Sequence, residues 1–323
     1  MKVLFVASGN KSVGTISPFV RSQYESLQQE GLDMLLYPIV GHGWKPYAKA
    51  IVDIHKLIKK EKPDIVHAHY SVCGVVASLA SCCTKTKVVV SILGSFPSQN
   101  FKVRWVRFFI KHIWDSTLVK SQRTANQLGM DLPVIPNGVD LDMFQLINYQ
   151  EARRLCGFEV GKKYVIWCSN PSRIEKRYNL AQKSIEQLNN DSVVLYPVYD
   201  KTHAEVVKYM CAADVLLLTS FSEGSPNVIK EALTCNCPVV TTNVGDVRER
   251  LSGLDGCYVV DEEPSYEDLF PEAEQLSSCL GKVLSFVGRT NGRERIIHDG
   301  ITTKQIAQKI IHIYKGICHY TIS

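Results

Sequence analysis

The sequence predicts an α/β fold built from two Rossmann-like domains, each a parallel sheet covered by helices. The chain of 323 residues is longer than one typical domain. Short apolar runs alternate with helical segments of about 10–15 residues, which is typical of βαβ units. The alternation pauses at two prolines and the stretch NGVDLDMF and then restarts, which divides the chain into domains 1–145 and 146–302.

The first domain begins with an apolar strand and a glycine-containing loop. Ser17 is the expected N-cap of the following helix, Pro18 its first residue and Gly31 its end. The remaining elements expected in this domain are strand 32–40, helix 47–62, strand 64–70, helix 74–83, strand 87–93, and a strand, helix and strand within 118–140.

The second domain repeats this architecture. We expect strand 164–170, helix 177–189, strand 192–198, helix 203–213, strand 214–220, helix 226–235 and strand 238–244. A final helix, 303–320, could pack back on the first domain.

Composition excludes several classes of protein. The net charge of +5 is too small, without a basic stripe, to predict a nucleic-acid partner. The 11 cysteines follow no disulfide or zinc spacing, and His67 and His69 lack a partner motif, so we expect reduced cysteines and no metal. The N-terminal apolar run is too short for a signal peptide, and no run approaches the ~18 residues of a membrane span. These features predict a cytoplasmic protein.

The most informative stretch is SFSEGSPNVIKEALTCNCPVVTTNVGD, residues 220–246. A strand ends at a tight loop containing Gly224, Ser225 can cap the next helix, and Pro226 is its expected first residue. A helix N-terminus at the carboxyl edge of a parallel sheet suits a phosphate group. Glu223 and Glu231 flank this start, and carboxylates accept hydrogen bonds from sugar hydroxyls. The loop therefore predicts a sugar-nucleotide site.

The spacing of the two glutamates and the residues around them resemble the signature of glycosyltransferase family 4, the large retaining family with the GT-B fold, in which two Rossmann-like domains face each other across a cleft. NPSRIEKRYNLA resembles the family's phosphate-binding segment, so the resemblance implies that Lys176 and Arg173 neutralise the donor diphosphate. It also implies that Glu223 binds the donor sugar and Glu231 the ribose. The resemblance further implies that the stretch Gly224, Ser225, Pro226 and Asn227 contributes to the donor site.

The first domain resembles the family in DIVHAHY, VVVSILGS and VIPNGVD. The resemblance implies that Gly14 approaches the donor diphosphate and that His69, Gly94 and Ser95 lie on the acceptor side. Phe96 stands where many members have an acidic residue, which puts a carboxylate role there in doubt.

Two other nucleotide-binding classes fit less well. Gly9 and Gly14 have the glycine spacing of a P-loop, but Thr15 and Ile16 follow instead of Lys and Ser or Thr. No G-x-G-x-x-G opens the first helix, as a dinucleotide enzyme would need. A noncatalytic nucleotide-sugar-binding protein of the same fold remains an alternative.

Residues 101–114 form a basic and aromatic stretch. On a helix, Trp105, Phe108, Phe109 and Ile113 share one face, and Arg104, Arg107 and Lys111 share another, with Lys102 nearby. This pattern fits an interfacial helix on an anionic membrane. It equally fits a Rossmann helix that packs its aromatic side chains inward.

The resemblance thus implies retaining transfer of a sugar from a nucleoside diphosphate, with UDP the expected nucleotide, to a glycan or lipid-linked acceptor in cell-surface polysaccharide or glycolipid assembly. No cofactor or metal is expected, because Lys and Arg charges and a helix dipole can stabilise the leaving diphosphate.

Overall fold

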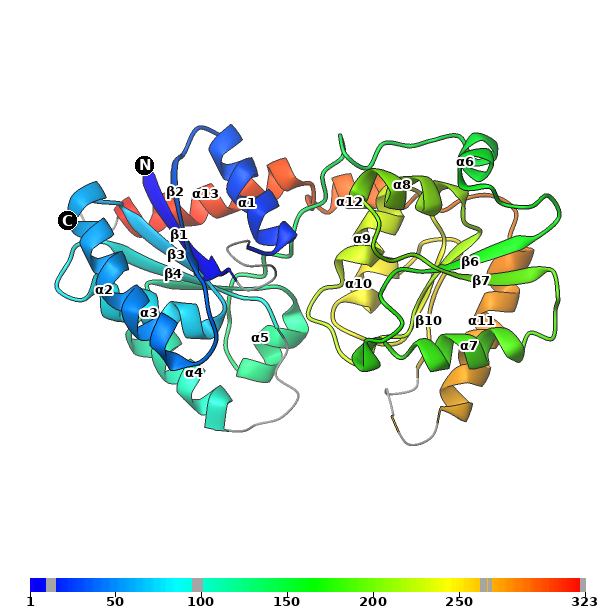
Figure 1. The fold of residues 1–323 in the computed structure, drawn as a ribbon, viewed down its shortest axis with the longest axis horizontal. Helices are drawn as coiled ribbons and strands as arrows, with labels where there is room; N and C mark the ends of the chain where they lie inside the picture. The colour runs from blue at the N-terminus through cyan, green and yellow to red at the C-terminus, as the bar shows by residue number, and fades with distance from the viewer. Residues whose placement is uncertain (10–15, 95–100, 262–265, 267–268, 320–323) are drawn as a thin grey trace. The chain divides into compact units, whose positions relative to one another are not determined.

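The computed structural model describes residues 1–9, 16–94, 101–261, 266 and 269–319. The chain divides into two compact units (Figure 1). Unit 1 comprises Met1–Gly138 and Thr303–Ser323, and unit 2 comprises Val139–Thr302. Each unit has its own sheet and its own apolar core, as the sequence predicted.

Unit 1 contains a parallel sheet of five strands in the order β2-β1-β3-β4-β5. The strands are β1 (Lys2–Ser8), β2 (Asp33–Ile39), β3 (Ile65–His69), β4 (Lys87–Ile92) and β5 (Ser116–Val119). The helices are α1 (Pro18–Gln29), α2 (Trp44–Glu61), α3 (Ser71–Ser81), α4 (Phe101–His112), α5 (Gln122–Leu128) and α13 (Thr303–His319).

Alternating side chains of these strands face two different cores. One core joins the sheet to α1 and α13 through residues such as Phe5, Val20 and Tyr314. The other joins it to α2, α3 and α4 through residues such as Ile54 and Val106. Figure 1 shows α1 and α13 on one face of the sheet and α2, α3 and α4 on the other.

Unit 2 contains a second parallel sheet of five strands, in the order β10-β9-β8-β6-β7. Its strands are β6 (Lys163–Trp167), β7 (Val193–Pro197), β8 (Val215–Leu218), β9 (Val239–Thr241) and β10 (Cys257–Val259). Its helices are α6 (Tyr149–Cys156), the 3-10 helix Ile174–Lys176, α7 (Tyr178–Glu186), α8 (His203–Ala212), α9 (Asn227–Thr234), α10 (Val247–Leu251), α11 (Phe270–Ser285) and α12 (Gly292–His298). Helices α7 and α11 cover one face, and α8, α9 and α12 cover the other (Figure 1).

Unit 2 begins at Val139, earlier in the chain than the boundary at residue 146 that the sequence predicted. The backbone N–H of Val139 donates to the carbonyl of Ile301 at 2.9 Å, and Phe144 is buried in the core of unit 2. Residues 139–145 therefore pack with the second unit rather than the first. The strand expected within 133–140 is reduced to two isolated bridges, Val134 with Val119 and Val139 with Thr302.

Candidate active site

The loop between β8 and α9 carries the first of the predicted catalytic residues. Glu223 accepts a hydrogen bond from Lys176 Nζ in a close ion pair. Lys176 ends the 3-10 helix that follows β6, and β6 and β8 are paired neighbours in the sheet. Two segments 47 residues apart thus meet at the carboxyl edge of the sheet. The side chains are only 17% and 20% exposed, so water screens the pair weakly.

Arg173 does not join this pair. Its guanidinium contacts the Glu175 carboxylate at 2.6 Å, and its side chain is 54% exposed. The charge of Arg173 is therefore balanced locally and faces solvent. To reach a phosphate group, Arg173 would have to exchange Glu175 for the ligand.

The neighbouring Arg177, which the sequence reasoning did not select, holds the backbone of this segment. Arg177 is 2% exposed, and its guanidinium donates to both carboxylate oxygens of Glu272 at 2.6 and 2.7 Å. Arg177 Nε also donates to the carbonyl of Thr219 at 2.8 Å, and Thr219 Oγ1 donates to the carbonyl of Lys176 at 2.7 Å. These bonds fix Lys176 against the end of β8. No sequence signal distinguishes Arg177, because its partner lies 95 residues away.

The start of α9 differs in detail from the prediction. Pro226 occupies the N-cap position, and Ser225 does not cap the helix. Instead Ser225 Oγ donates to Asp246 Oδ2 at 2.9 Å and lies 3.2 Å from Lys230 Nζ. The cap assignment was wrong because a buried carboxylate and a buried cation compete for the hydroxyl.

A close backbone contact holds the loop over its neighbour. Gly245 has φ +58°, and a Cβ there would lie 2.6 Å from the carbonyl oxygen of Gly224. Only glycine fits such a position without displacing the loop. Gly224, Ser225, Pro226 and Asn227 therefore lie together beside Gly245 and Asp246.

Lys230 and Glu231 are adjacent ionisable residues on α9. Burial lowers the pKa of Lys230 to about 8, against the opposing effect of Asp246. Burial raises the pKa of Glu231 to about 7, which Lys230 partly offsets. Both shifts favour the neutral forms, so a ligand that stabilises the Glu231 carboxylate would bind in competition with a proton. Glu231 was predicted from the sequence, whereas Lys230 was not.

In unit 1, His69 ends β3 and is fully buried. Its ring stacks on His67 with 4.6 Å between centroids, and neither ring nitrogen has a hydrogen-bond partner among the described residues. Burial, with the nearby charges of His67 and Lys120, lowers the pKa of His69 well below its ordinary value. His69 is therefore neutral near pH 7 and can exchange a hydrogen bond with a hydroxyl group.

The other acceptor-side predictions are only partly placed. The position of a Cβ on Gly94 has open space around it, with no atom within 4 Å. Gly14 and Ser95 lie outside the described residues. Lys120, which the sequence reasoning missed, is 2% exposed and follows β5 at the same edge of the sheet.

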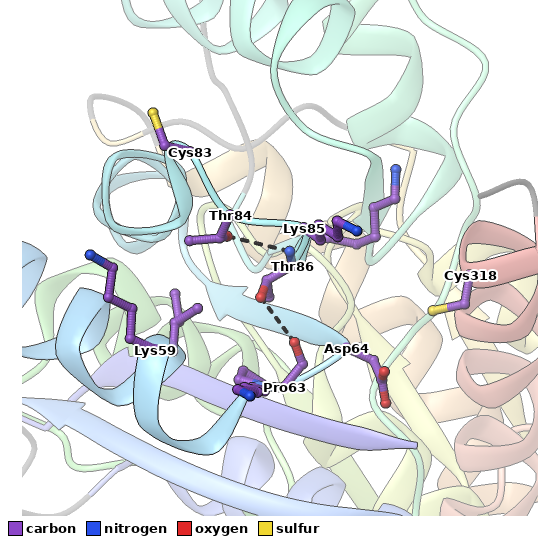
Figure 2. A pocket seen from close by; sticks show the side chains of 11 residues that line it. Lys59, Pro63, Asp64, Cys83, Thr84, Lys85, Thr86 and Cys318 are labelled. Carbon is purple, nitrogen blue, oxygen red and sulfur yellow. Dashed lines mark hydrogen bonds between the residues drawn. The ribbon is translucent and has the colours of Figure 1, made fainter. Parts of the chain in front are cut away.

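A cavity of about 610 Å³, lined by several lysine and threonine side chains, lies at the opposite, amino edge of this sheet (Figure 2). The dashed bonds in Figure 2 join Thr84 Oγ1 to the N–H of Thr86 and Thr86 Oγ1 to the carbonyl of Pro63. Lys87, another lining residue, pairs with Asp115 at 3.0 Å. None of the predicted site residues lines this cavity.

The described residues were searched for metal-binding groups and for membrane-spanning helices. They contain no group of three or more His, Cys, Asp or Glu side chains placed to hold a metal ion. They also contain no helix with the length and apolar character needed to cross a membrane.

Two family models match this chain, one largely in each unit. The model described as Glycosyltransferase Family 4 matches residues 19–143, and the one described as Glycosyl transferases group 1 matches residues 159–278. The second match includes Lys176, Glu223 and Glu231. The chain belongs to glycosyltransferase family 4.

Individual relatives of this family 4 chain are distant. A Bacillus subtilis glycosyltransferase named for teichuronic acid biosynthesis is 26% identical over 232 residues, which cover 63% of this chain and 59% of the relative. The Escherichia coli UDP-Gal:alpha-D-GlcNAc-diphosphoundecaprenol alpha-1,3-galactosyltransferase is 22% identical over 319 residues, covering 82% and 79% of the two chains. The chain therefore spans less than two thirds of the first relative's length.

Solved structures confirm the predicted GT-B fold. An Anabaena protein in complex with UDP-glucose superposes with a TM-score of 0.70, at 15% identity over 98% of this chain and all of that one.

Proposed function

We propose that this family 4 member is a retaining glycosyltransferase that moves a sugar from a nucleoside diphosphate to a glycan or lipid-linked acceptor in cell-surface polysaccharide or glycolipid assembly. The observation that carries the proposal is the Lys176–Glu223 ion pair at the carboxyl edge of the unit 2 sheet. The names of the two curated relatives support the pathway, and the E. coli name supports a lipid-diphosphate acceptor. The UDP-glucose complex supports UDP as the nucleotide.

In this proposal the ion pair is exchanged for two contacts with the donor. Lys176 moves to the diphosphate, and Glu223 is then able to accept hydrogen bonds from the sugar hydroxyls. The loop from Gly224 to Pro226 leads into α9 at Asn227, and the positive dipole end of this helix is directed at the same phosphate groups. Glu231 binds the ribose, and Arg173 is a second candidate cation for the diphosphate.

Retention follows if the acceptor oxygen attacks the anomeric carbon from the face that the leaving diphosphate occupies. The bond from that carbon to the diphosphate oxygen breaks, and its electron pair goes to the diphosphate. The new carbon–oxygen bond forms on the same face, while the proton of the acceptor hydroxyl passes to the leaving phosphate oxygen. Lys176 and the helix dipole stabilise the charge that develops there, so this step as proposed uses no metal.

On the acceptor side we assign His69, Gly94 and Ser95 to unit 1. A neutral His69 with unpartnered ring nitrogens among the described residues suits a hydroxyl better than an anion. The proposal gives unit 1 the acceptor and unit 2 the donor.

We also propose that α4 brings the protein to the cytoplasmic face of an anionic membrane. Phe109 is buried as the inward-packing alternative requires, but Trp105 and Phe108 are about half exposed beside Arg104 and Lys111. Arg107 belongs to the fold instead, because its guanidinium donates to the carbonyls of Leu128 and Gln127 at 2.5 and 3.3 Å.

A donor screen followed by a turnover assay tests the enzymatic proposal. Nucleoside diphosphate sugars would be screened for a rise in melting temperature, since a ligand that binds only the folded state raises it. The best binder would then be incubated with candidate acceptors and the anomeric configuration of the product determined by NMR. A donor that binds but is never transferred or hydrolysed would favour the noncatalytic alternative, and an inverted product would overturn retention.

A further inference from the structure

An apolar groove of about 570 Å³ lies in unit 1 between α2, α3 and α4. These three helices cover the same face of the first sheet (Figure 1). Side chains from all of them line the groove, including Trp44 and Ile51 of α2, Val72 and Leu79 of α3, and Trp105 and Phe109 of α4. The groove takes no part in the donor site, which lies in unit 2.

The walls of the groove expose large apolar side chains. Trp44 is 74% exposed, Leu79 54% and Trp105 48%. Single exposed apolar residues are common, but a contiguous group that lines a concavity is typical of a binding site. The volume is in the range of pockets that hold small molecules.

The helices around the groove carry mainly positive charge. Helix α4 contains Lys102, Arg104, Arg107 and Lys111 and no acidic residue, and α3 contains no charged residue. Helix α2 adds the exposed Lys45 and Lys49.

The two acidic residues of α2 both have partners. Asp53 accepts a hydrogen bond from Tyr37 Oη at 3.1 Å, and Glu61 forms an ion pair with Lys2 at 3.3 Å. An apolar groove within a cationic surface complements a molecule with a hydrocarbon chain and an anionic head.

The groove also has a direction. In a parallel βαβ unit, each helix runs back along the sheet, so its N-terminus lies at the carboxyl edge of the strands. Trp44, Ser71 and Lys102 stand at the first or second position of their helices and line the groove at that edge. Leu79 lies eight residues further along α3, which corresponds to ~12 Å at the helical rise per residue. The groove therefore leads away from the edge at which His69 and Gly94 lie.

We infer that this groove binds the hydrocarbon chain of a lipid-linked acceptor, with the acceptor's phosphate near Lys102 and its sugar toward the carboxyl edge of the sheet. The inference rests on the proposed function and makes it more specific, because it assigns the lipid a binding site distinct from general contact with a bilayer. A groove of this length takes only the first part of a long chain and leaves the remainder in the membrane.

The chain site can be tested without turnover. Hexyl, octyl, decyl and dodecyl phosphate would be titrated below the concentrations at which they aggregate, in the absence of vesicles. Three of the four tryptophans, Trp44, Trp105 and Trp114, line the groove, so their fluorescence reports binding. We expect saturable binding that tightens about fourfold per added methylene until the groove is filled. A decyl phosphate brominated at its chain end should quench this fluorescence.

A matched pair of variants separates the groove from surface charge. Leu79→Glu places a carboxylate in the groove, and Val52→Glu places one at an equally exposed position of α2 that does not line it. We expect Leu79→Glu to weaken decyl phosphate binding about tenfold or more, and Val52→Glu to change it by about twofold or less. Circular dichroism would confirm that both variants fold.

Steady-state kinetics with acceptors that carry or lack the hydrocarbon chain then test whether the groove binds the acceptor. Leu79→Glu should raise the KM for a lipid-linked acceptor and leave the KM for the same acceptor without its chain unchanged. Equal effects of the two variants on chain binding, or a signal that never saturates, would overturn the inference and indicate only general attraction of the anion to the cationic surface. Saturable chain binding with no transfer to any acceptor would instead overturn the proposed function and leave a lipid site.

Discussion

Unit 1 and unit 2 use the same scaffold but place different chemistry at the carboxyl edge of their sheets. In unit 2 the edge carries the partly exposed ion pair of Lys176 and Glu223 and the partly buried Glu231. In unit 1 it carries the buried, neutral His69 and opens onto an apolar groove. The contrast matches the two proposed substrates, because a nucleoside diphosphate is recognised by charge and a lipid by apolar surface.

The largest expected effect concerns the buried ion pair that supports the Lys176 segment of unit 2. Arg177 and Glu272 form a buried ion pair, with side chains 1% and 3% exposed. Removing one partner of such a pair typically costs about 3–5 kcal/mol, because the other charge stays buried without compensation. We expect Glu272→Ala to lower the free energy of unfolding of unit 2 by about that amount. Hydrogen exchange with mass spectrometry would measure it separately for each unit.

Glu274→Ala is the matched control, since Glu274 lies two residues away on α11 and is exposed. Its exchange should differ little from the wild type. Equal protection of α7 and β8 in both variants would mean that the Arg177–Glu272 pair does not support the Lys176 segment.

The next largest expected effect is on kcat, when a cation near the proposed leaving group is removed. We expect Lys176→Ala to lower kcat about 10²-fold or more, as for the loss of one group that stabilises the transition state. Arg173→Ala should change kcat much less, because Arg173 is paired with Glu175 and exposed to solvent. Donor hydrolysis or transfer would be assayed at saturating donor. Similar losses in the two variants would remove the distinction that the structure draws between these cations.

Residues that are close together in the chain could be predicted from the sequence, and residues whose partners are distant could not. Periodicity and turn residues predicted both sheets, and the Glu223 motif could be assigned because its residues lie close together in the chain. Lys176 required the family resemblance, since its contact with Glu223 spans 47 residues. Arg177, Lys120 and Lys230 were missed because burial makes them important, and a lone basic residue gives no sign of burial. The Ser225 cap was predicted wrongly for a related reason, as Asp246 competes for the hydroxyl from 21 residues away.

A smaller effect is expected for membrane contact by unit 1. Each exposed cation near an anionic surface contributes about 1 kcal/mol, so reversing Arg104 and Lys111 together should weaken vesicle binding about thirtyfold or more. Sedimentation with vesicles rich in phosphatidylserine, at low and high salt, would measure it. The control is Lys59→Glu with Lys85→Glu, which reverses two exposed cations at the cavity in Figure 2. Equal binding by both double variants would contradict a specific role for α4.

The smallest effect we predict is a pH dependence of donor binding in unit 2. Burial raises the pKa of Glu231 to about 7, so the free protein holds it largely protonated at pH 6 and largely ionised at pH 8. The carboxylate is the form proposed to accept hydrogen bonds from the ribose. Affinity for the donor should therefore rise about tenfold from pH 6 to pH 8, as the ionised fraction does.

Glu231→Gln separates this titration from that of the donor's own phosphate groups. The variant should bind more weakly at pH 8, and the ratio of wild-type to variant affinity, measured by calorimetry, should fall toward pH 6. Stability should move in the opposite direction. A carboxyl whose folded pKa is raised loses stabilisation as pH rises from its unfolded pKa of about 4.5 through 7, so Glu231→Gln should gain stability relative to the wild type over that range. A constant affinity ratio would show that the Glu231 carboxylate does not contact the donor, and the charge contrast between the two units would then rest on Lys176 and Glu223 alone.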